Sequence, residues 1–571
     1  MKLSKNAKII LKGSFLKKDK EGNVIESPED MFERVAENIA SAEKIYNPKA
    51  NLKKIEENFY KIMANLEFLP NAPTLRNAGR EFQQLAACFV LPVPDSIEGI
   101  FEAVKNMALI QKSGGGTGFS FSRLRPEGSR VKETQGVASG PVSFMKVFDT
   151  ATGAIREGGV RRGANMGILR VDHPDTLKFI TCKKKANEFT NFNISVALTQ
   201  KFMRALQEDK DFKLIDPRTK KVAQKIKARK IFNLICQMAW LNGEPGVIFI
   251  DEINRHNPTP KLGKIEATNP CGEVNLLAYE SCNLGSINLS KMVKNGEIDW
   301  NKLKNLTHLG IHFLDNVIDK TNFPLPKIKE MTRANRKIGL GVMGFADFLI
   351  KLGIPYDSNR ALNLAKKIMR FINEESKDAS RDLAQKRGVF PNFKKSIYAK
   401  KGLRLRNATT IAIAPTGTLS LIADTSPSIE PIFAPIYLEI VTLFKKPLLV
   451  INSLFKKMAQ EQEFYSKKLI QKVLASGSCR GIKEIPKDVQ EIFVCAHDVS
   501  PEWHVKIQGA FQKYTDNSVS KTVNLPENAK KEDVKKIFMM AYKFNLKGLT
   551  IYREKSRKEQ ILNTCKCKIT N

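Results

Sequence analysis

The spacing of apolar residues predicts a helical region at the start of the chain. In residues 1–70, apolar side chains recur with the period of amphipathic helices. One such stripe consists of Met31, Val35 and Ile39. Ser27 stands just before this stripe and is followed by a proline and two acidic residues, which is the signature of a helix start. We therefore predict a small helical N-terminal region over residues 1–70.

From residue 71 to residue 552 the pattern changes to glycine-rich loops that alternate with helix-like stretches and short apolar runs. These runs, which we interpret as strands, are Gly246–Ile250, Thr409–Ala414 and Gly548–Tyr552. Such alternation is typical of an α/β fold with mainly parallel strands. No internal repeat or Pro/Ser-rich linker divides this part of the sequence. We therefore predict one large α/β domain over residues 71–552.

Residues 553–571 form a third segment of different character. They are polar and rich in lysine, and they contain Cys565 and Cys567 close to the end. A segment of this composition at a terminus is expected to be a mobile tail.

The composition is that of a globular protein. Apolar residues make up 42% and charged residues 27% of the 571 residues, and no charge-free run is long enough to span a bilayer. Lysines interrupt every apolar stretch near the N-terminus, so the continuous apolar region of a signal peptide is missing. We expect a cytoplasmic protein with no membrane partner.

The net charge has three interpretations. The chain has 94 Lys+Arg against 59 Asp+Glu, a formal charge of +35, which first indicates a nucleic-acid-binding protein. The basic residues are spread from Lys2 to Lys568 without a long block of one sign, which favours a solvated lysine-rich exterior. We therefore expect no stable nucleic-acid binding and keep a basic nucleic-acid-binding protein as the remote alternative. Small polyanions such as nucleotides would fit the charge equally well.

The sequence around Cys271 predicts a reactive site. Asn269 and Glu273 stand two residues to either side of Cys271, and in an extended loop these three side chains point to one face. A thiol, a carboxylate and an amide together suit hydrogen-atom or proton transfer at a polar substrate. The alternative is an ordinary turn, because Asn-Pro and Cys-Gly pairs are common in turns.

Nine cysteines in a cytoplasmic chain are not expected to form structural disulfides. Cys282 follows Cys271 closely, Cys88 lies far upstream, and Cys565 and Cys567 are in the tail. A Cys-x-Cys pair on a mobile tail could exchange with a disulfide elsewhere, since exchange requires access by a thiolate. A metal-binding fragment or a frayed end is the alternative, although zinc is disfavoured because only one close cysteine pair exists.

Three glycine-rich segments resemble anion-binding loops: Ser113–Gly118, Gly158–Gly163 and Pro415–Ser420. The first lacks the Gly-Lys-Ser/Thr ending of a Walker A loop. The second adds two guanidinium groups, and the third would open a helix after an apolar strand. Each alone suits a structural turn, whereas three together favour a nucleotide ligand.

These motifs together resemble the catalytic chain of ribonucleotide reductases, most closely the adenosylcobalamin-dependent class II ribonucleoside-diphosphate reductases. The resemblance runs through nearly the whole chain. The matching segments are residues 26–36, 68–79, 86–100, 113–129, 138–149, 158–169, 243–254, 267–289, 413–434 and 515–526.

The resemblance implies a ten-stranded α/β barrel with Cys271 on a central finger loop. Cys271 would carry a thiyl radical that abstracts the 3′-hydrogen of the ribose. Glu273 would be the general base on the 3′-hydroxyl, and Asn269 would bind the sugar hydroxyls. Cys88 and Cys282 would deliver the reducing equivalents and close to a redox disulfide. Cys565 and Cys567 would then reduce that disulfide, with a thioredoxin-like protein as their donor.

The resemblance also implies binding residues for substrate and effector. The expected substrate-binding residues are Thr74, Ala87, Cys88, Gly116, Asn269, Pro270, Cys271, Gly272, Glu273, Pro415, Thr416, Gly417, Thr418 and Leu419. The expected effector residues are Asp95, Lys132, Arg161 and Arg162, and the loop 158–166 would pass the identity of a dNTP or ATP effector to the substrate site. Ribonucleoside diphosphates are the expected substrates, triphosphates are the alternative, and a homodimer is the assembly considered.

The class of ribonucleotide reductase that the sequence resembles is indicated by the motifs of the other two classes. Class I chains receive a radical through adjacent tyrosines, whereas here Tyr552 is the only aromatic residue in Leu549–Arg553. No glycyl-radical motif of class III is present. We therefore expect adenosylcobalamin as cofactor, with a class I chain that needs a separate radical-generating subunit as the alternative.

The resemblance begins at residue 26, so we expect no N-terminal ATP cone. A Cys-x-Cys disulfide is strained, which weakens the role of the tail pair.

Overall fold

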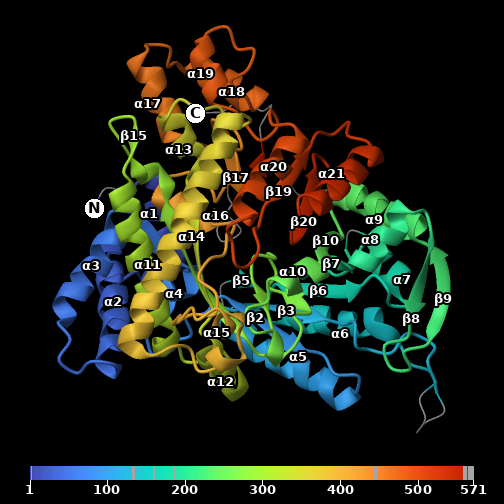
Figure 1. The fold of residues 1–571 in the computed structure, drawn as a ribbon. Coiled ribbons are helices and arrows are strands. Elements are labelled where there is room, and N and C mark those ends of the chain that lie inside the picture. The colour runs from blue at the N-terminus through green and yellow to red at the C-terminus, as the bar shows by residue number, and fades with distance from the viewer. Residues whose placement is uncertain are drawn as a thin grey trace.

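A barrel of β-strands lies at the centre of the molecule and helices cover its outside (Figure 1). The computed structural model describes residues 1, 3–130, 136–157, 161–185, 187–440, 447–556 and 562–563. Within these residues, no helix combines the length and the apolar character needed to cross a membrane.

The predicted helical N-terminal region is present. It contains α1 (Lys5–Ser14), α2 (Pro28–Ala40) and α3 (Leu52–Ala64). The Ser27 side chain accepts a hydrogen bond from the backbone N–H of Asp30, and the Asp30 side chain accepts one from Ser27 in return, which is a capping box. The predicted stripe on α2 is fully buried against α3 and the long helix α11 (Trp300–Lys320).

Five parallel strands form the first half of the barrel. They are β2 (Cys88–Pro92), β3 (Gly116–Ser120), β6 (Asn165–Arg170), β7 (Phe192–Leu198) and β10 (Gly246–Phe249). Helices return the chain between them, among them α5 (Ile97–Lys112), α6 (Gly140–Ala154) and α9 (Ala228–Asn242). This is the repeated strand–helix–strand arrangement that parallel pairing requires.

The second half contains β13 (Ser281–Asn288) parallel to β16 (Ile338–Met343), and β19 (Thr522–Leu525) parallel to β20 (Gly548–Arg553). Bridges from Leu340 to Ile411 and from Ile413 to Val519 join these pairs and close the barrel. The halves meet in antiparallel pairings of β13 with β2 and of β10 with β20. The predicted ten-stranded α/β barrel is confirmed, with two antiparallel seams that the expectation of mainly parallel strands did not include.

One predicted strand is replaced by isolated bridges. The run Thr409–Ala414 makes no continuous ladder, although Gly246–Phe249 and Gly548–Arg553 are strands as predicted. The Asp516 carboxylate accepts hydrogen bonds from the backbone N–H groups of Thr410 (2.7 Å) and Ile411 (3.2 Å). A side chain therefore takes the place of the neighbouring strand at this point.

A two-stranded hairpin fills the inside of the barrel. Its strands are β11 (Ala267–Thr268) and β12 (Asn275–Leu276), and they pack with inward-facing side chains such as Ile168 and Leu284. At Gly118 of β3, an added Cβ would lie 1.7 Å from the carbonyl oxygen of Thr268. Glycine is therefore required there for the hairpin to sit against the barrel wall.

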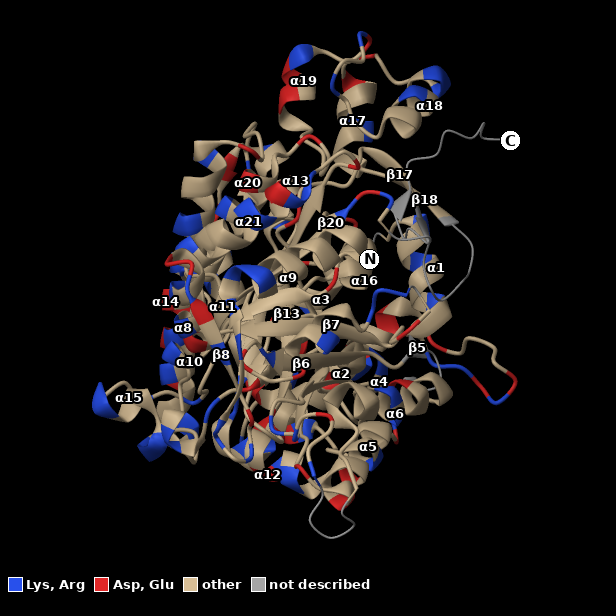
Figure 2. Ribbon diagram, turned by 90° about the vertical axis from the view of Figure 1, so that its right-hand side faces the viewer, with Lys and Arg blue, Asp and Glu red and all other residues tan. Residues whose placement is uncertain are grey.

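The remaining elements complete the outside of the barrel and its upper part. The helices are α4 (Ala72–Asn77), α7 (Thr176–Thr181), α8 (Gln200–Gln207), α10 (Ile250–Arg255), α12 (Pro326–Asn335), α13 (Phe345–Lys351), α14 (Asn359–Arg387), α15 (Ile397–Lys400), α16 (Gly417–Ala423), α17 (Ser453–Glu461), α18 (Lys467–Ser476), α19 (Lys487–Ile492), α20 (Pro501–Gln512) and α21 (Lys531–Lys543). The strands are β1 (Phe68–Pro70), β4 (Arg156–Glu157), β5 (Arg161–Arg162), β8 (Asp211–Ile215), β9 (Val222–Lys227), β14 (Val293–Lys294), β15 (Glu297–Ile298), β17 (Ile436–Ile440), β18 (Pro447–Ile451) and β21 (Leu562–Asn563). Figure 2 shows Lys and Arg on elements throughout the molecule with acidic residues between them, as a solvated lysine-rich exterior would have.

A buried cluster of charges holds the second half of the barrel to its helices. Asp315 on α11 is fully buried and accepts hydrogen bonds from the guanidinium groups of Arg336 (2.9 Å), Arg387 (2.9 Å) and Arg406 (3.3 Å). These three cations hold the pKa of Asp315 well below its usual value despite the opposing effect of burial. Asp315 therefore connects three buried arginines, of which Arg336 also pairs with Asp319 and Arg387 with Glu43.

We predict that Asp315→Ala destabilises the fold by about 3–5 kcal/mol, because it removes the carboxylate that pairs with the buried Arg406 and one of the two that pair with Arg336 and with Arg387. Urea unfolding measures the free energy of unfolding. Asp378→Ala is the matched control, since Asp378 pairs with Arg381 at the exposed surface and its loss should cost about 1 kcal/mol or less. Equal losses for the two variants would contradict this account of the cluster.

Candidate active site

The β11–β12 hairpin, called the finger hairpin from here on, holds residues 269–273 in a fixed turn at its tip. The Gly272 N–H donates to the carbonyl oxygen of Asn269 (3.0 Å), and Gly272 has φ +79°. The barrel holds the loop from both sides: Asn193 Nδ2 donates to the Pro270 carbonyl (2.8 Å), and the Ser518 N–H donates to the Glu273 carbonyl (2.8 Å). Both interpretations of this sequence therefore apply, because the segment is a turn and also brings polar side chains together.

The Asn269 amide connects three groups. Its Nδ2 donates to Cys88 Sγ (3.1 Å) and to Glu273 Oε2 (2.8 Å), while its Oδ1 accepts from the Val274 N–H (3.1 Å). Asn269 and Glu273 are each 2% exposed, whereas Cys271 is exposed. The loop thus places an amide and a carboxyl group inside the barrel and a thiol at the edge of a cavity.

Cys88 and Cys282 lie directly opposite each other on the antiparallel strands β2 and β13. Cross-strand neighbours have their Cβ atoms about 4.5–5.5 Å apart, close to the separation that a disulfide needs. Both residues are buried and reduced. Burial raises the pKa of both thiols well above the usual value, and the nearby Glu273 carboxylate raises both further. The pair is therefore held as neutral thiols, the form that can donate hydrogen.

Burial also changes Glu273. It raises the pKa of the Glu273 carboxyl to about 7, although the hydrogen bond from Asn269 opposes this shift. A carboxyl group that titrates near neutral pH can both accept and return a proton. The group is therefore suited to act as a general base.

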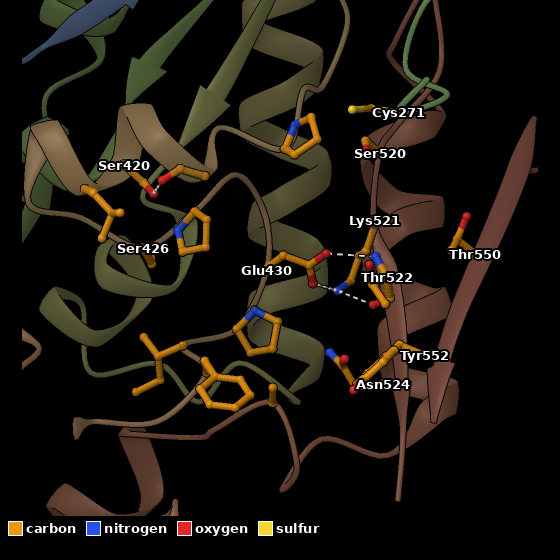
Figure 3. A pocket seen from close by; sticks show the side chains of 18 of the residues that line it. Cys271, Ser420, Ser426, Glu430, Ser520, Lys521, Thr522, Asn524, Thr550 and Tyr552 are labelled. Carbon is orange, nitrogen blue, oxygen red and sulfur yellow. Dashed lines mark hydrogen bonds and ion pairs between the residues drawn. The ribbon is translucent and has the colours of Figure 1, made fainter. Parts of the chain in front are cut away.

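A cavity of about 1070 Å³ adjoins the finger loop. Pro270, Cys271 and Gly272 line it at one end, and strands β19 and β20 line it further along (Figure 3). Small-molecule sites are commonly about 300–1,000 Å³, so this cavity has room for a large ligand or for two. Within the described residues, no group of three or more His, Cys, Asp or Glu side chains could hold a metal ion.

The predicted phosphate segment at the start of α16 reaches the same cavity. Pro415 and Gly417 line it. Thr416 adopts φ +55°, and its Oγ1 accepts from the Ser428 N–H (2.7 Å), while the side chain of Leu419 is buried in the core. Thr418 is half-buried in the first turn of the helix.

The other predicted substrate residues lie within the protein around the finger. The Thr74 hydroxyl is fully buried, close to Asn71 Oδ1 (2.8 Å) and the Leu85 carbonyl (3.1 Å). The Ala87 N–H donates to the Cys282 carbonyl (3.3 Å). Gly116 lies beside Pro270, where an added Cβ would be 3.0 Å from Pro270 Cγ.

Of the predicted effector residues, Asp95 does not line this cavity. Asp95 accepts hydrogen bonds from the backbone N–H (3.0 Å) and the guanidinium Nε (2.9 Å) of Arg125. Arg161 and Arg162 form β5, which pairs with β4. Lys132, Cys565 and Cys567 lie outside the described residues.

The sequence analysis missed residues that support or line the site. These are Asn193, Glu430, Ser518, Ser520, Lys521, Thr522 and Asn524. A signal was present for some of them, since polar side chains at every second position from Ser518 to Asn524 predict one polar face of a strand. Asn193 and Glu430 had no local pattern of this kind.

Comparison with known proteins gives a consistent result. The description "Ribonucleotide reductase, all-alpha domain" matches residues 1–83, and "Ribonucleotide reductase, barrel domain" matches residues 86–552. Relatives named vitamin B12-dependent ribonucleoside-diphosphate reductase include one from Thermoplasma acidophilum, 48% identical over 98% of this chain and 80% of its own length. Another, from Mycobacterium tuberculosis, is 45% identical over 99% of this chain and 81% of its own length.

The solved structures show the same fold. The Actinobacillus ureae class Id ribonucleotide reductase alpha subunit has a TM-score of 0.79 and 23% identity, with 97% of each chain covered. The barrel with its finger hairpin therefore agrees with the sequence matches. This chain belongs to the ribonucleotide reductase family.

Proposed function

We propose that this protein reduces ribonucleoside diphosphates to 2′-deoxyribonucleotides by radical chemistry that starts at Cys271 and depends on adenosylcobalamin. One arrangement of residues carries the proposal. The finger loop places Cys271 at a large cavity, and the Asn269 amide donates hydrogen bonds both to the Glu273 carboxyl group and to the Cys88 thiol. The relatives named as vitamin B12-dependent reductases support the choice of cofactor.

In the proposed reaction the finger residues activate the ribose. A thiyl radical on Cys271 takes the hydrogen atom from C3′ and becomes a thiol. Glu273 accepts the proton of the 3′-hydroxyl, for which its raised pKa is suited. Asn269 holds Glu273 in place and orients the sugar hydroxyls. Cys271 later returns the hydrogen atom to C3′ and is a thiyl radical again.

Cys88 and Cys282 supply the two electrons of the reduction. The 2′-hydroxyl leaves as water after it takes a proton from this pair, and the two sulfurs close to a disulfide as the ribose is reduced. Neutral thiols are required for this step, and burial provides them. The cross-strand position of the pair allows the bond to form without a rearrangement of the strands.

The cavity beside Cys271 fits adenosylcobalamin. Its volume of about 1070 Å³ lies at the upper end of the range for small-molecule sites, and it continues from the finger loop along β19 and β20. The residues that would hold the cofactor are on these strands and on the facing segment Pro431–Ala434. When bound, the cofactor supplies the radical chemistry that a thiol alone cannot start.

The substrate phosphates are proposed to bind near the start of α16. Pro415 and Gly417 line the same cavity as the finger loop, and the resemblance adds Thr416, Thr418, Leu419, Thr74, Ala87 and Gly116 as substrate-binding residues. A dNTP or ATP effector is proposed to bind at Asp95, Lys132, Arg161 and Arg162. Asp95 would then exchange its contact with Arg125 for the nucleotide.

The tail from residue 553 to residue 571 is proposed as a redox segment distinct from the helical region 1–70 and the barrel 71–552. Its described residues Leu562–Asn563 form β21, which pairs antiparallel with β17, a strand whose Tyr437 lines the cavity. Cys565 stands two residues after Asn563 in the sequence. This supports exchange of Cys565 and Cys567 with the Cys88–Cys282 disulfide and recharging by a thioredoxin-like protein in the cytoplasm, where thiols stay reduced.

A homodimer is proposed through α5. Ile97, Phe101 and Leu109 on this helix are 58%, 50% and 40% exposed. Exposed apolar side chains along one helix are typical of a protein interface. A second copy of the same helix would cover them in a two-fold arrangement.

We predict that the wild-type protein forms deoxyribonucleotides anaerobically with adenosylcobalamin and a dithiol, and that Cys271→Ser abolishes this activity. Serine cannot form a thiyl radical under these conditions. Cys182→Ser is the control and should retain activity, since Cys182 lies outside the finger and the cavity. Activity that appears only with an added metalloprotein would favour the class I alternative, and normal turnover by Cys271→Ser would refute the assignment.

We predict that the Glu273 carboxyl titrates near pH 7 and that activity rises as it ionises. Asn269→Ala removes the hydrogen bond that stabilises the carboxylate, so its pKa should move upward. Infrared difference spectra recorded as a function of pH follow the band of the protonated Glu273 carboxyl group, which is absent in Glu273→Gln. They measure the pKa of Glu273 in wild type and in Asn269→Ala. Titration near the usual glutamate value in wild type, or a downward shift in Asn269→Ala, would show that burial does not control this group.

We predict that the double variant Cys565→Ser, Cys567→Ser completes about one turnover per site and then stops when a thioredoxin-type protein is the reductant. The Cys88–Cys282 disulfide remains closed because no tail thiol reaches it. A small dithiol should restore turnover, which separates loss of exchange from loss of the site. Sustained turnover with the protein reductant would exclude the tail role.

A further inference from the structure

The part of the cavity away from Cys271 has one polar wall. It is formed by alternating polar residues: Ser520 just before β19, Thr522 and Asn524 on β19, and Thr550 and Tyr552 on β20 (Figure 3). Val523, which stands between Thr522 and Asn524, is buried in the core and does not line the cavity. The period of two in this strand therefore turns Thr522 and Asn524 toward the cavity and Val523 toward the core. On β20, the core residues Leu549 and Ile551 also touch the cavity beside Thr550 and Tyr552.

The facing wall is apolar. Pro431, Ile432, Phe433 and Ala434 line it, and Leu449 and Val450 of β18 extend it. The two walls form a slot, which polar residues of other segments such as Asn452, Ser453 and His497 also line. A large ligand with an extended apolar face and hydrogen-bonding groups at its rim would match this slot better than a small, uniformly polar ligand.

Glu430 presents a carboxylate within this slot. Its Oε1 accepts from the Thr522 N–H (2.8 Å), and its Oε2 accepts from Lys521 Nζ. The Glu430 side chain is 22% exposed, whereas Lys521 has no exposed side-chain surface. Each carboxylate oxygen can accept more than one hydrogen bond, so Glu430 retains acceptor capacity toward the cavity.

Lys521 holds the Glu430 carboxylate in a fixed orientation. Its ammonium group also donates to His504 Nδ1 (3.0 Å) and to the Thr522 carbonyl (3.3 Å), so its three hydrogens are satisfied. Burial lowers the pKa of His504 well below its usual value, and its Nε2 lies 3.4 Å from the Ala496 carbonyl. His504 is therefore neutral, and its Nδ1 can accept the hydrogen bond from Lys521.

We propose that Glu430, held by Lys521, and Asn524 bind the primary amide groups at the rim of the corrin ring. This inference rests on the proposed function and names residues that position its cofactor. An amide N–H₂ donates to a carboxylate, and the Asn524 side chain can both donate to and accept from an amide. Substrate phosphates are poor ligands for this place, because a fixed carboxylate repels them.

The adenine amino group of the adenosyl ligand could also donate a hydrogen bond to Glu430. The probe must therefore distinguish this group from the amides of the corrin rim. Cyanocobalamin contains the corrin ring and its amides but no adenosyl group. A change in its affinity therefore reports contacts of the corrin rim. The adenosyl group would instead be indicated if only adenosylcobalamin binding changed, and that result would overturn the proposal.

The test compares the cyanocobalamin dissociation constants of wild type, Glu430→Gln and Asn524→Ala by equilibrium dialysis. We expect each variant to bind at least about tenfold more weakly, the usual effect of losing a hydrogen bond to a charged or well-placed group. Glu502→Gln is the matched control, since Glu502 pairs with Lys536 outside the cavity, and it should bind as wild type does. Thermal unfolding of each variant and its affinity for the nucleotide substrate should stay near the wild-type values.

A second arm uses cyanocobalamin derivatives in which one rim amide has been hydrolysed to a carboxylate. Wild type should bind at least one isomer about tenfold more weakly than the parent, because its carboxylate meets Glu430. Glu430→Gln should narrow this difference to about threefold or less. A purely structural role of Glu430 would weaken the parent and all isomers equally, and that result would refute direct contact.

Different results would overturn the proposed function and the assignment of Glu430 and Asn524. If wild type does not bind cyanocobalamin and does not turn over with adenosylcobalamin, the proposed function fails. If wild type binds and turns over while Glu430→Gln and Asn524→Ala bind equally tightly, only the assignment of these residues fails.

Discussion

The hydrogen bonds of the Asn269 side chain hold together the part of the molecule on which the chemistry depends. Its Nδ2 reaches both Cys88 on the barrel wall and Glu273 on the finger. This is possible only because Gly118 lets the finger hairpin lie against β3, where a Cβ would collide with the Thr268 carbonyl. The absence of a side chain at Gly118 and the amide of Asn269 therefore set how close the Cys88 thiol lies to the Glu273 carboxyl group.

Burial then gives each group a different chemical form. It keeps Cys88 and Cys282 as neutral thiols and brings the pKa of Glu273 to about 7, while Cys271 remains exposed to the cavity. Further along the cavity, Lys521 compensates the charge of Glu430 and keeps it fixed. In the proposed reaction, the same low-dielectric interior supplies the proton acceptor Glu273, the hydrogen donors Cys88 and Cys282, and the hydrogen-bond acceptor Glu430 in separate places.

The sequence predicts local features well and long-range ones only through resemblance. The helix start at Ser27 and the strands Gly246–Phe249 and Gly548–Arg553 follow from nearby residues. The run Thr409–Ala414 has the composition of a strand, but the distant Asp516 takes its backbone N–H groups. The pairing of Cys88 with Cys282 and the contact of Glu430 with Lys521 join segments far apart in the chain, and no local spacing records them.

The central claim is that Cys271 removes the hydrogen atom at C3′ of the ribose and later returns it. Turnover of a substrate with deuterium at C3′ tests this most directly, with the rate and the position of the label in the product as readouts. The account predicts slower turnover of the deuterated substrate and a product that retains deuterium at C3′. Equal rates for both substrates, with the label lost from C3′, would contradict it.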